Sequence, residues 1–228
     1  WDQNLWDNKV FPNNEFLNKL FPDKFVLLRR IDGHALLVNN LVIDKADINY
    51  QTQVSGGSIL IKDNKPTGVL IDKAMDLAMS ILPPVSDKEI AKALVEAEKR
   101  AFENGLTTVD DAGLDKRIIQ AIDSLHEIEQ LRIRVYAMIS NTSKNLNYFL
   151  DKGIIENEKL TVRSVKAYLD GALGSRGALL KNPYSDDKNN KGITITSKED
   201  LFELADQLSS KGFQLNTHAI GDKANEIV

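Results

Sequence analysis

The chain has 228 residues, of which 42% are hydrophobic, and a formal net charge of −4 at pH 7. This length and composition suit one large or two small folded domains rather than a disordered chain. Acidic and basic residues are interspersed, so no basic patch can neutralise phosphates and we expect no nucleic-acid partner. Because the chain has no cysteines, disulfides and thiolate metal sites are excluded.

No apolar run approaches the roughly 20 residues that a membrane span needs, so we expect no membrane partner. The N-terminus, WDQNLWDNKV, has neither the basic nor the apolar region of a signal peptide. A cytoplasmic location is therefore favoured, although we also expect the natural N-terminus to lie upstream of Trp1.

Residues 1–82 show no regular alternation of strands and helices. Turn-forming residues punctuate this region and separate short apolar segments. The expected elements are a helix over 13–20 capped by Asn13 or Asn14, a buried strand over 26–29, an apolar segment over 36–41, and a hairpin formed by 58–62 and 69–71. We interpret residues 1–82 as an inserted α+β subdomain packed on the rest of the chain.

From residue 83 onward, helices and strands alternate. Ser86 and Glu89 form a capping box after Pro83-Pro84, which predicts a helix that ends at Gly105. Its buried face is expected to contain Ile90, Leu94, Ala97 and Ala101. The elements expected next are a strand over 106–109, a helix over 115–130, a strand over 132–139, a helix over 143–152, a strand from 161, a helix capped by Ser197, a strand from 214 and a final helix.

This alternation predicts an α/β fold with parallel strands joined by right-handed crossovers. Four such units in residues 83–228 would be half of a (β/α)8 barrel of the TIM type. An open doubly wound sheet would give the same local pattern. A dinucleotide site is not indicated, because Gly171-Ala172-Leu173-Gly174 lacks the G-x-G-x-x-G spacing.

Two strand-like stretches carry residues suited to chemistry. Lys166 lies in the middle of one stretch, and His218 lies at the C-terminal end of the other. Each has a simpler interpretation, as a solvated lysine and as a hydrogen-bonded structural histidine. In a barrel, however, the C-terminal ends of parallel strands open on one face, where active sites lie. We therefore predict that Lys166 and His218 project toward a common point.

The string Val165-Lys166-Ala167-Tyr168-Leu169-Asp170-Gly171-Ala172-Leu173-Gly174-Ser175-Arg176, followed by Thr217-His218-Ala219-Ile220-Gly221-Asp222, resembles the amidohydrolase superfamily. The closest match is to the branch called amidohydrolase family 3, which includes N-substituted formamide deformylases. Residues 1–6, 30–35 and 66–70 fit the same branch. The resemblance implies a barrel and a metal-dependent hydrolase that cleaves a non-peptide C–N bond in a small-molecule amide.

The same resemblance implies a metal site. Lys166, carboxylated to a carbamate, would bridge two metal ions, and His218 would be a ligand through one imidazole nitrogen. Burial would lower the pKa of Lys166 and favour the neutral amine that takes up carbon dioxide. One or two divalent ions are expected, with Zn²⁺ best suited to the N and O ligands.

Three further residues are candidates for substrate binding: His34, Asp170 and Arg176. Each also has a structural interpretation. His34 could hold a turn, Asp170 could accept backbone N–H bonds in the glycine-rich loop, and Arg176 could pair with a loop carboxylate. For Asp170 and Arg176 the structural interpretation is favoured. His126 is expected at the surface of a helix.

The chain lacks the His-x-His pair and the last-strand aspartate of the superfamily. We therefore expect an internal segment, with the acid/base aspartate downstream, and an isolated chain that is inactive and binds metal weakly. The alternative is a non-catalytic binding or regulatory module that retains the barrel. Bare strand edges at Leu106 and Gln214 would either pair with missing strands or drive association into a homo-oligomer.

Overall fold

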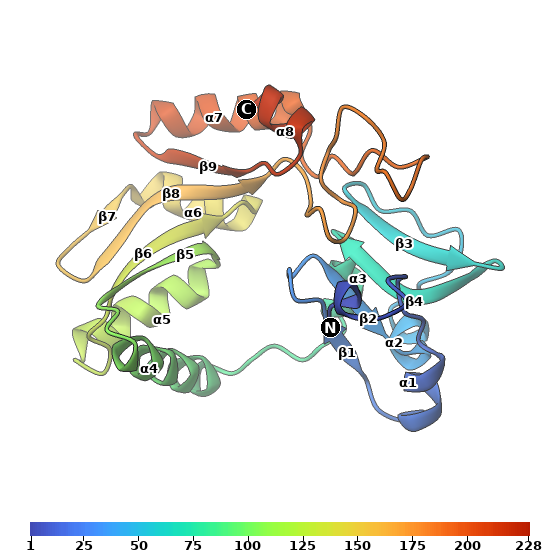
Figure 1. The fold of residues 1–228 in the computed structure, drawn as a ribbon. Helices are drawn as coiled ribbons and strands as arrows, with labels where there is room; N and C mark the ends of the chain where they lie inside the picture. The colour runs from blue at the N-terminus through green and yellow to red at the C-terminus, as the bar shows by residue number, and fades with distance from the viewer. The chain divides into compact units, whose positions relative to one another are not determined.

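The computed structural model describes residues 1–228, which divide into two compact units (Figure 1). Unit 1 contains Trp1–Pro83, Tyr168–Lys198 and His218–Val228, and unit 2 contains Pro84–Ala167 and Glu199–Thr217. Each unit thus combines segments that are far apart in the sequence. The division of the chain at residues 82 and 83 into an insertion and a set of βα units stays a prediction.

Unit 1 is built on a four-stranded antiparallel sheet with the order β1-β2-β4-β3. Its strands are β1 (Leu27–Arg29), β2 (Ala35–Val38), β3 (Gly57–Lys62) and β4 (Lys65–Asp72). The two central strands are covered on both faces: Leu36 and Leu70 belong to one apolar cluster, whereas Leu37 and Val69 belong to another. Successive strand residues point to opposite faces, so two separate cores form.

Unit 1 also contains short helices. They are η1 (Gln3–Leu5), α1 (Glu15–Leu20), α2 (Asn40–Lys45), α3 (Met75–Met79) and α8 (Asp222–Ile227). The apolar segment predicted over 36–41 is in fact divided, because β2 ends at Val38 and α2 begins at Asn40. Buried Asn39 fixes this break, since its side-chain amide donates to the carbonyl oxygens of Phe21 and Lys24 at 2.9 and 2.8 Å.

Unit 2 contains a parallel ladder of β5, β6 and β8. Its strands are β5 (Thr108–Leu114), β6 (Arg134–Ser140), β7 (Ile155–Glu156), β8 (Leu160–Tyr168) and β9 (Gln214–His218), and its helices are α4 (Asp87–Glu103), α5 (Lys116–Glu127), α6 (Ser143–Lys152) and α7 (Lys198–Ser210). β9 pairs with β8, and β7 pairs antiparallel with the start of β8. The prediction of an α/β fold with parallel strands is confirmed. None of the helices is long and apolar enough to cross a membrane.

The strand predicted over 106–109 begins later and extends further than expected. β5 pairs with β6 through Asp110, Asp111 and Ala112, although these positions follow no strand-like pattern. The register shifts next to Gly113, whose φ is +134°. Pairing with a neighbouring strand therefore overrides local propensity here, and a bulge with glycine absorbs the irregularity.

Two predictions about side-chain burial on the helices are wrong. On α4, Ala97 is exposed whereas Glu98 is buried, because its Oε2 accepts a hydrogen bond from the backbone N–H of Ile133 at 2.7 Å. On α5, His126 is 8% exposed rather than at the surface, and its Nε2 lies 3.0 Å from the Ile133 carbonyl oxygen. Polar side chains are buried where a backbone group bonds to them.

The capping box predicted at the start of α4 is confirmed. The Ser86 hydroxyl accepts a hydrogen bond from the Glu89 backbone N–H, and the Glu89 carboxylate accepts one from the Ser86 N–H at 2.9 Å. Substitution Ser86→Ala should lower the free energy of unfolding by about 1 kcal/mol, because a helix N–H loses its acceptor. Urea unfolding measures this loss. Ser209→Ala, at an exposed position in α7, is the control, and an equal loss in both variants would contradict the prediction.

Candidate functional site

His34, which is partly buried, and Asp72, which is buried, form a pair at the end of the central strands of unit 1. His34 immediately precedes β2 and Asp72 ends β4, and because Ala35 pairs with Ile71 the two residues lie opposite one another. The His34 Nδ1 and the Asp72 Oδ1 are 2.6 Å apart. This hydrogen bond raises the pKa of His34, against the opposing effect of burial. Asp72 is the functional candidate that the sequence did not indicate.

Two further rings, those of Tyr168 and His218, lie near the ring of His34. Tyr168 is the last residue of β8 and His218 is the last residue of β9. The ring of His34 lies 5.0 Å from that of His218 and 6.3 Å from that of Tyr168, centroid to centroid, and the other two rings are 5.3 Å apart. The structure therefore brings together His34 and His218, which the sequence assigned to different roles.

A pocket of about 460 Å³ opens at this place in unit 1. This volume lies within the range of small-molecule sites. The pocket is lined by His34, Asp72 and Tyr168 together with Arg29, Asp32, Gly33, Lys73, Met75, Asp76 and Ile195. Its lining combines imidazole, phenol, carboxylate and cationic groups, so it offers both hydrogen-bond donors and acceptors to a polar ligand.

Asp170 holds the loop after β8 to the turn after β9. It is completely buried, and its carboxylate accepts hydrogen bonds from the backbone N–H groups of Leu179, Ile220 and Gly221 at 2.8 to 2.9 Å. These contacts are those of the structural interpretation given above. A contact between Asp170 and substrate stays a prediction.

Glycines let this loop approach the His34–Asp72 pair closely. A Cβ atom at Gly171 would lie 2.3 Å from the Asp72 Oδ2, and one at Gly177 would lie 2.6 Å from the same oxygen. The carbonyl oxygen of Gly171 in turn lies 3.4 Å from the His218 Nε2. Asp72 thus faces the loop at Gly171, and the same glycine meets His218 through its carbonyl oxygen.

Arg176 lies on the far part of the same loop. Its Nη2 donates to the Asp186 Oδ2 at 2.7 Å, and its guanidinium carbon lies 5.3 Å from the centre of the Phe11 ring. The hydrogen bond from Arg176 lowers the pKa of the exposed Asp186. These contacts match the loop-pairing interpretation, and a role of Arg176 in substrate binding stays a prediction.

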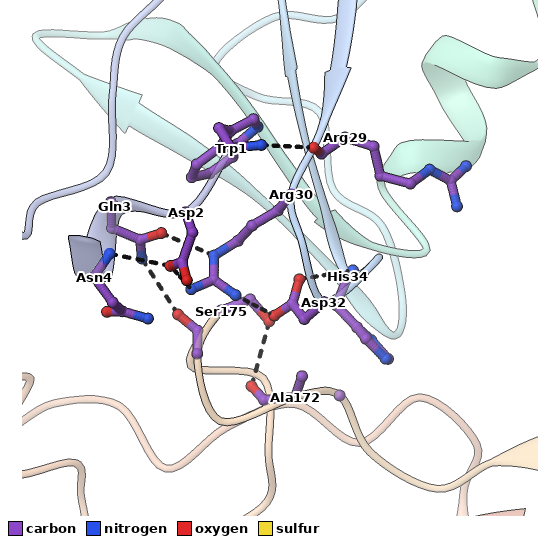
Figure 2. A network of polar contacts seen from close by, with 12 residues as sticks. Trp1, Asp2, Gln3, Asn4, Arg29, Arg30, Asp32, His34, Ala172 and Ser175 are labelled. Carbon is purple, nitrogen blue, oxygen red and sulfur yellow. Dashed lines mark hydrogen bonds and ion pairs between the residues drawn. The ribbon is translucent and has the colours of Figure 1, made fainter. Parts of the chain in front are cut away.

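Arg30 is a second residue that the sequence did not indicate (Figure 2). It is 3% exposed, and its guanidinium donates to Gln3, Asp2 and Asp32 at 2.8, 3.2 and 2.5 Å. Asp32 also accepts a hydrogen bond from the backbone N–H of His34 at 3.0 Å. Arg30 therefore fixes the turn that carries His34. No local pattern signals this role, because Asp2 and Gln3 are far from Arg30 in the sequence.

Lys166 lies in the part of β8 that belongs to unit 2, where it pairs with Ser140 of β6. Its Cγ would be 3.9 Å from a Cβ at Gly113. Burial lowers the pKa of Lys166, which favours the neutral amine. Because Lys166 belongs to unit 2 and His218 to unit 1, their convergence on a common point stays a prediction.

Lys166 and His218 are chemically suited to be two of the ligands of a metal site. Ligating histidines commonly donate one ring N–H to a carbonyl, and the His218 Nε2 lies 3.4 Å from the Gly171 carbonyl oxygen. Among residues 1–228 no group of three or more histidine, aspartate or glutamate side chains is placed to hold a metal ion. Lys166 and His218 would therefore supply only part of the coordination.

The amidohydrolase family model matches residues 1–227, and the chain therefore belongs to the amidohydrolase family. The chain is 33% identical over 235 residues to the "Putative amidohydrolase YtcJ" of Bacillus subtilis (strain 168), covering 100% of this chain and 44% of that protein. It is 32% identical over 243 residues to "Protein LONG AFTER FAR-RED 3" of Arabidopsis thaliana, covering 100% and 41%. It is 25% identical over 206 residues to the "Exoenzymes regulatory protein AepA" of Pectobacterium carotovorum, covering 86% and 44%.

Two crystal structures of uncharacterized metal-dependent hydrolases share this fold. The one from Pyrococcus furiosus matches with a TM-score of 0.64 and 25% identity, and the one from Pyrococcus horikoshii OT3 with 0.67 and 24%. Each match covers 100% of this chain but 46% and 45%, respectively, of the other. The chain thus spans less than half the length of the curated relatives and solved structures described here.

Gly171→Ala tests the close approach of the loop to Asp72. The φ of Gly171 is not in the left-handed region, so the added Cβ acts through its clash with the carboxylate. We expect a loss of about 1–3 kcal/mol in the free energy of unfolding, as for other overpacked sites. In an Asp72→Ala background the same substitution should cost less, by at least about 0.5 kcal/mol. Equal costs in the two backgrounds, measured by urea unfolding, would show that the clash is not with Asp72.

Tyr184 provides a pH-dependent test of the same loop. Its hydroxyl donates to the Ala178 carbonyl oxygen at 2.9 Å, and burial raises its pKa to about 12. Because the folded-state pKa is raised, the stabilisation is fully present below pH 10 and is lost as the pH rises toward 12. At pH 8 the free energy of unfolding of the wild type should exceed that of Tyr184→Phe by about 1 kcal/mol. This difference should shrink above pH 10.

The control for this measurement is Tyr50→Phe, because Tyr50 is 53% exposed. Its difference from wild type should stay near zero over the same pH range. A constant Tyr184 difference up to pH 12 would contradict the assigned pKa direction.

Proposed function

We propose that the intact protein is a metal-dependent amidohydrolase that cleaves a C–N bond other than a peptide bond in a small-molecule amide. Family membership over residues 1–227 carries this proposal. The name of the Pyrococcus furiosus hydrolase supports the dependence on metal. The pocket beside His34 supports a small polar substrate, because its volume of about 460 Å³ suits a compact amide.

We also propose that unit 2 is part of a (β/α)8 barrel. The parallel pairing of β5, β6 and β8 and the pairing of β9 with β8 support four of its strands. Helices α4, α5, α6 and α7 precede or connect them along the chain. Residues 1–82 would then form an inserted α+β subdomain, and residues 83–228 the barrel units.

Lys166 and His218 are the proposed ligands of a divalent ion, with Zn²⁺ favoured by the N and O donors. The lowered pKa of Lys166 favours the neutral amine, whose reaction with carbon dioxide forms a C–N bond and releases a proton to leave a carbamate anion. When bound, the ion lowers the pKa of a water molecule toward neutrality and polarises the substrate carbonyl.

His34 is the preferred substrate-binding residue of the three candidates. Its ring lines the pocket, and its Nδ1 is engaged by Asp72, so the opposite edge of the imidazole is the one that a substrate would meet. Asp170 and Arg176 each hold the loop through other contacts. Their part in catalysis would be to keep His218 and the pocket wall in place. No residue of this chain is assigned as the acid or base.

One observation favours a second candidate function. A relative that is 25% identical to this chain is named as a regulatory protein. A binding or regulatory module that retains the fold without metal chemistry accounts for that name. The metal content of the intact protein separates the two functions.

Substitutions Lys166→Ala and His218→Ala test the enzymatic proposal in the intact protein. Each removes a ligand, so we expect Zn²⁺ affinity to fall by about 10–100-fold and hydrolysis of small amides and N-formyl amines to be lost. Elemental analysis and release of amine from a substrate panel give the two readouts. Lys99→Ala, at an exposed position in α4, is the control. A wild-type protein without bound metal would favour the regulatory module, whereas variants that keep metal and activity would contradict the assignment of Lys166 and His218 as ligands.

A further inference from the structure

The buried carboxylate of Asp72 bonds to His34 with one oxygen and faces the glycine-rich loop with the other. We propose that Asp72 is a positioning residue that sets the orientation of two imidazoles, His34 directly and His218 through Gly171. The consequence for catalysis rests on the proposed function, whereas the positioning itself does not. Neither the family resemblance nor the sequence pattern indicated this residue.

The first contact is direct. Asp72 continues the β2–β4 ladder, since its backbone N–H donates to the His34 carbonyl oxygen at 3.0 Å, and its Oδ1 lies 2.6 Å from the His34 Nδ1. A carboxylate accepts only, so the proton of this hydrogen bond belongs to the imidazole. The contact therefore fixes the ring plane of His34 and places a proton on Nδ1, which leaves Nε2 at the edge away from Asp72.

The second contact acts through the glycine loop. The Asp72 Oδ2 faces Gly171 and Gly177, where any Cβ would clash, and the Gly171 carbonyl oxygen receives the His218 Nε2 at 3.4 Å. A different side chain at position 72 would therefore change the position of the loop. It would also move the Gly171 carbonyl oxygen, which is the partner of His218. The two rings are 5.0 Å apart with planes inclined at 33°. One carboxylate bonds to the first ring and faces the loop glycine whose carbonyl oxygen meets the second.

Asp72 is a poor choice for stability alone. Its side chain is 1% exposed, yet its Oδ2 has no hydrogen-bond partner, and such an oxygen costs free energy when it is buried. Its backbone also adopts a φ of +49°, which is unfavourable for a residue other than glycine. Two local costs at one residue that lines a pocket point to a role in the site rather than in the core.

Nitrogen NMR of the intact protein, selectively labelled with ¹⁵N-histidine and held at one pH, tests the inference. The signals of His34 and His218 are assigned with the variants His34→Gln and His218→Gln. We expect a hydrogen-bonded Nδ1 proton for His34 in wild type, its loss in Asp72→Ala, and a simultaneous shift of the His218 ring nitrogens. Asp72→Asn retains an acceptor, so the His34 proton should persist at a changed shift.

Asp76→Asn is the matched control, because Asp76 lines the same pocket without a hydrogen bond to His34. Its imidazole signals should equal those of wild type. Unchanged His34 or His218 signals in Asp72→Ala, or equal changes in Asp76→Asn, would overturn the proposal. If Asp72→Ala does not fold, as judged by circular dichroism, Asp72→Asn decides, and signals identical to wild type refute it. None of these readouts depends on hydrolysis, so failure of the enzymatic proposal remains a separate result.

Discussion

The arrangement of unit 1 depends on the buried carboxylate of Asp170. Its two oxygens accept three backbone hydrogen bonds, one from Leu179 and two from Ile220 and Gly221 in the turn after β9. A charged group with no exposure is tolerated only when such bonds replace its hydration. The start of the glycine-rich loop, its far end and the residues beyond His218 are therefore joined at one point. The junction lies next to Gly171, whose carbonyl oxygen meets the His218 ring.

The parts of the fold that the sequence could predict are those set by local physics. The capping box of α4 and the alternation of strands and helices depend on residues close together in the chain. The extent of β5 was not predictable in this way, because Asp110 and Asp111 join the ladder only when β6 is present. Likewise, Glu98 and His126 are buried because Ile133 provides hydrogen-bonding groups from another segment.

The candidate site shows the same limit. His34 and His218 could be selected from the sequence because histidine after a turn or at a strand end suggests chemistry. Asp72 and Arg30 could not, since His34 is 38 positions from Asp72 and Asp2 is 28 positions from Arg30, although Asp32, a second partner of Arg30, is close in the chain. The loop glycines carry a visible pattern, but the space at Gly171 and Gly177 is taken by Asp72 and the space at Gly174 by Arg30. The identity of the two histidines suggested a chemical role, but their hydrogen-bond partners became visible only in the tertiary structure.

Burial of Arg30 among Asp2, Gln3 and Asp32 has an evolutionary consequence. A planar guanidinium reaches three acceptors in different directions, which a lysine ammonium on a flexible stem does not reproduce. Loss of one acid would leave a desolvated cation partly uncompensated, and loss of the arginine would leave two acids facing each other. Positions 2, 30 and 32 therefore constrain one another, and in a family alignment they should covary as a set while neighbouring exposed positions drift independently.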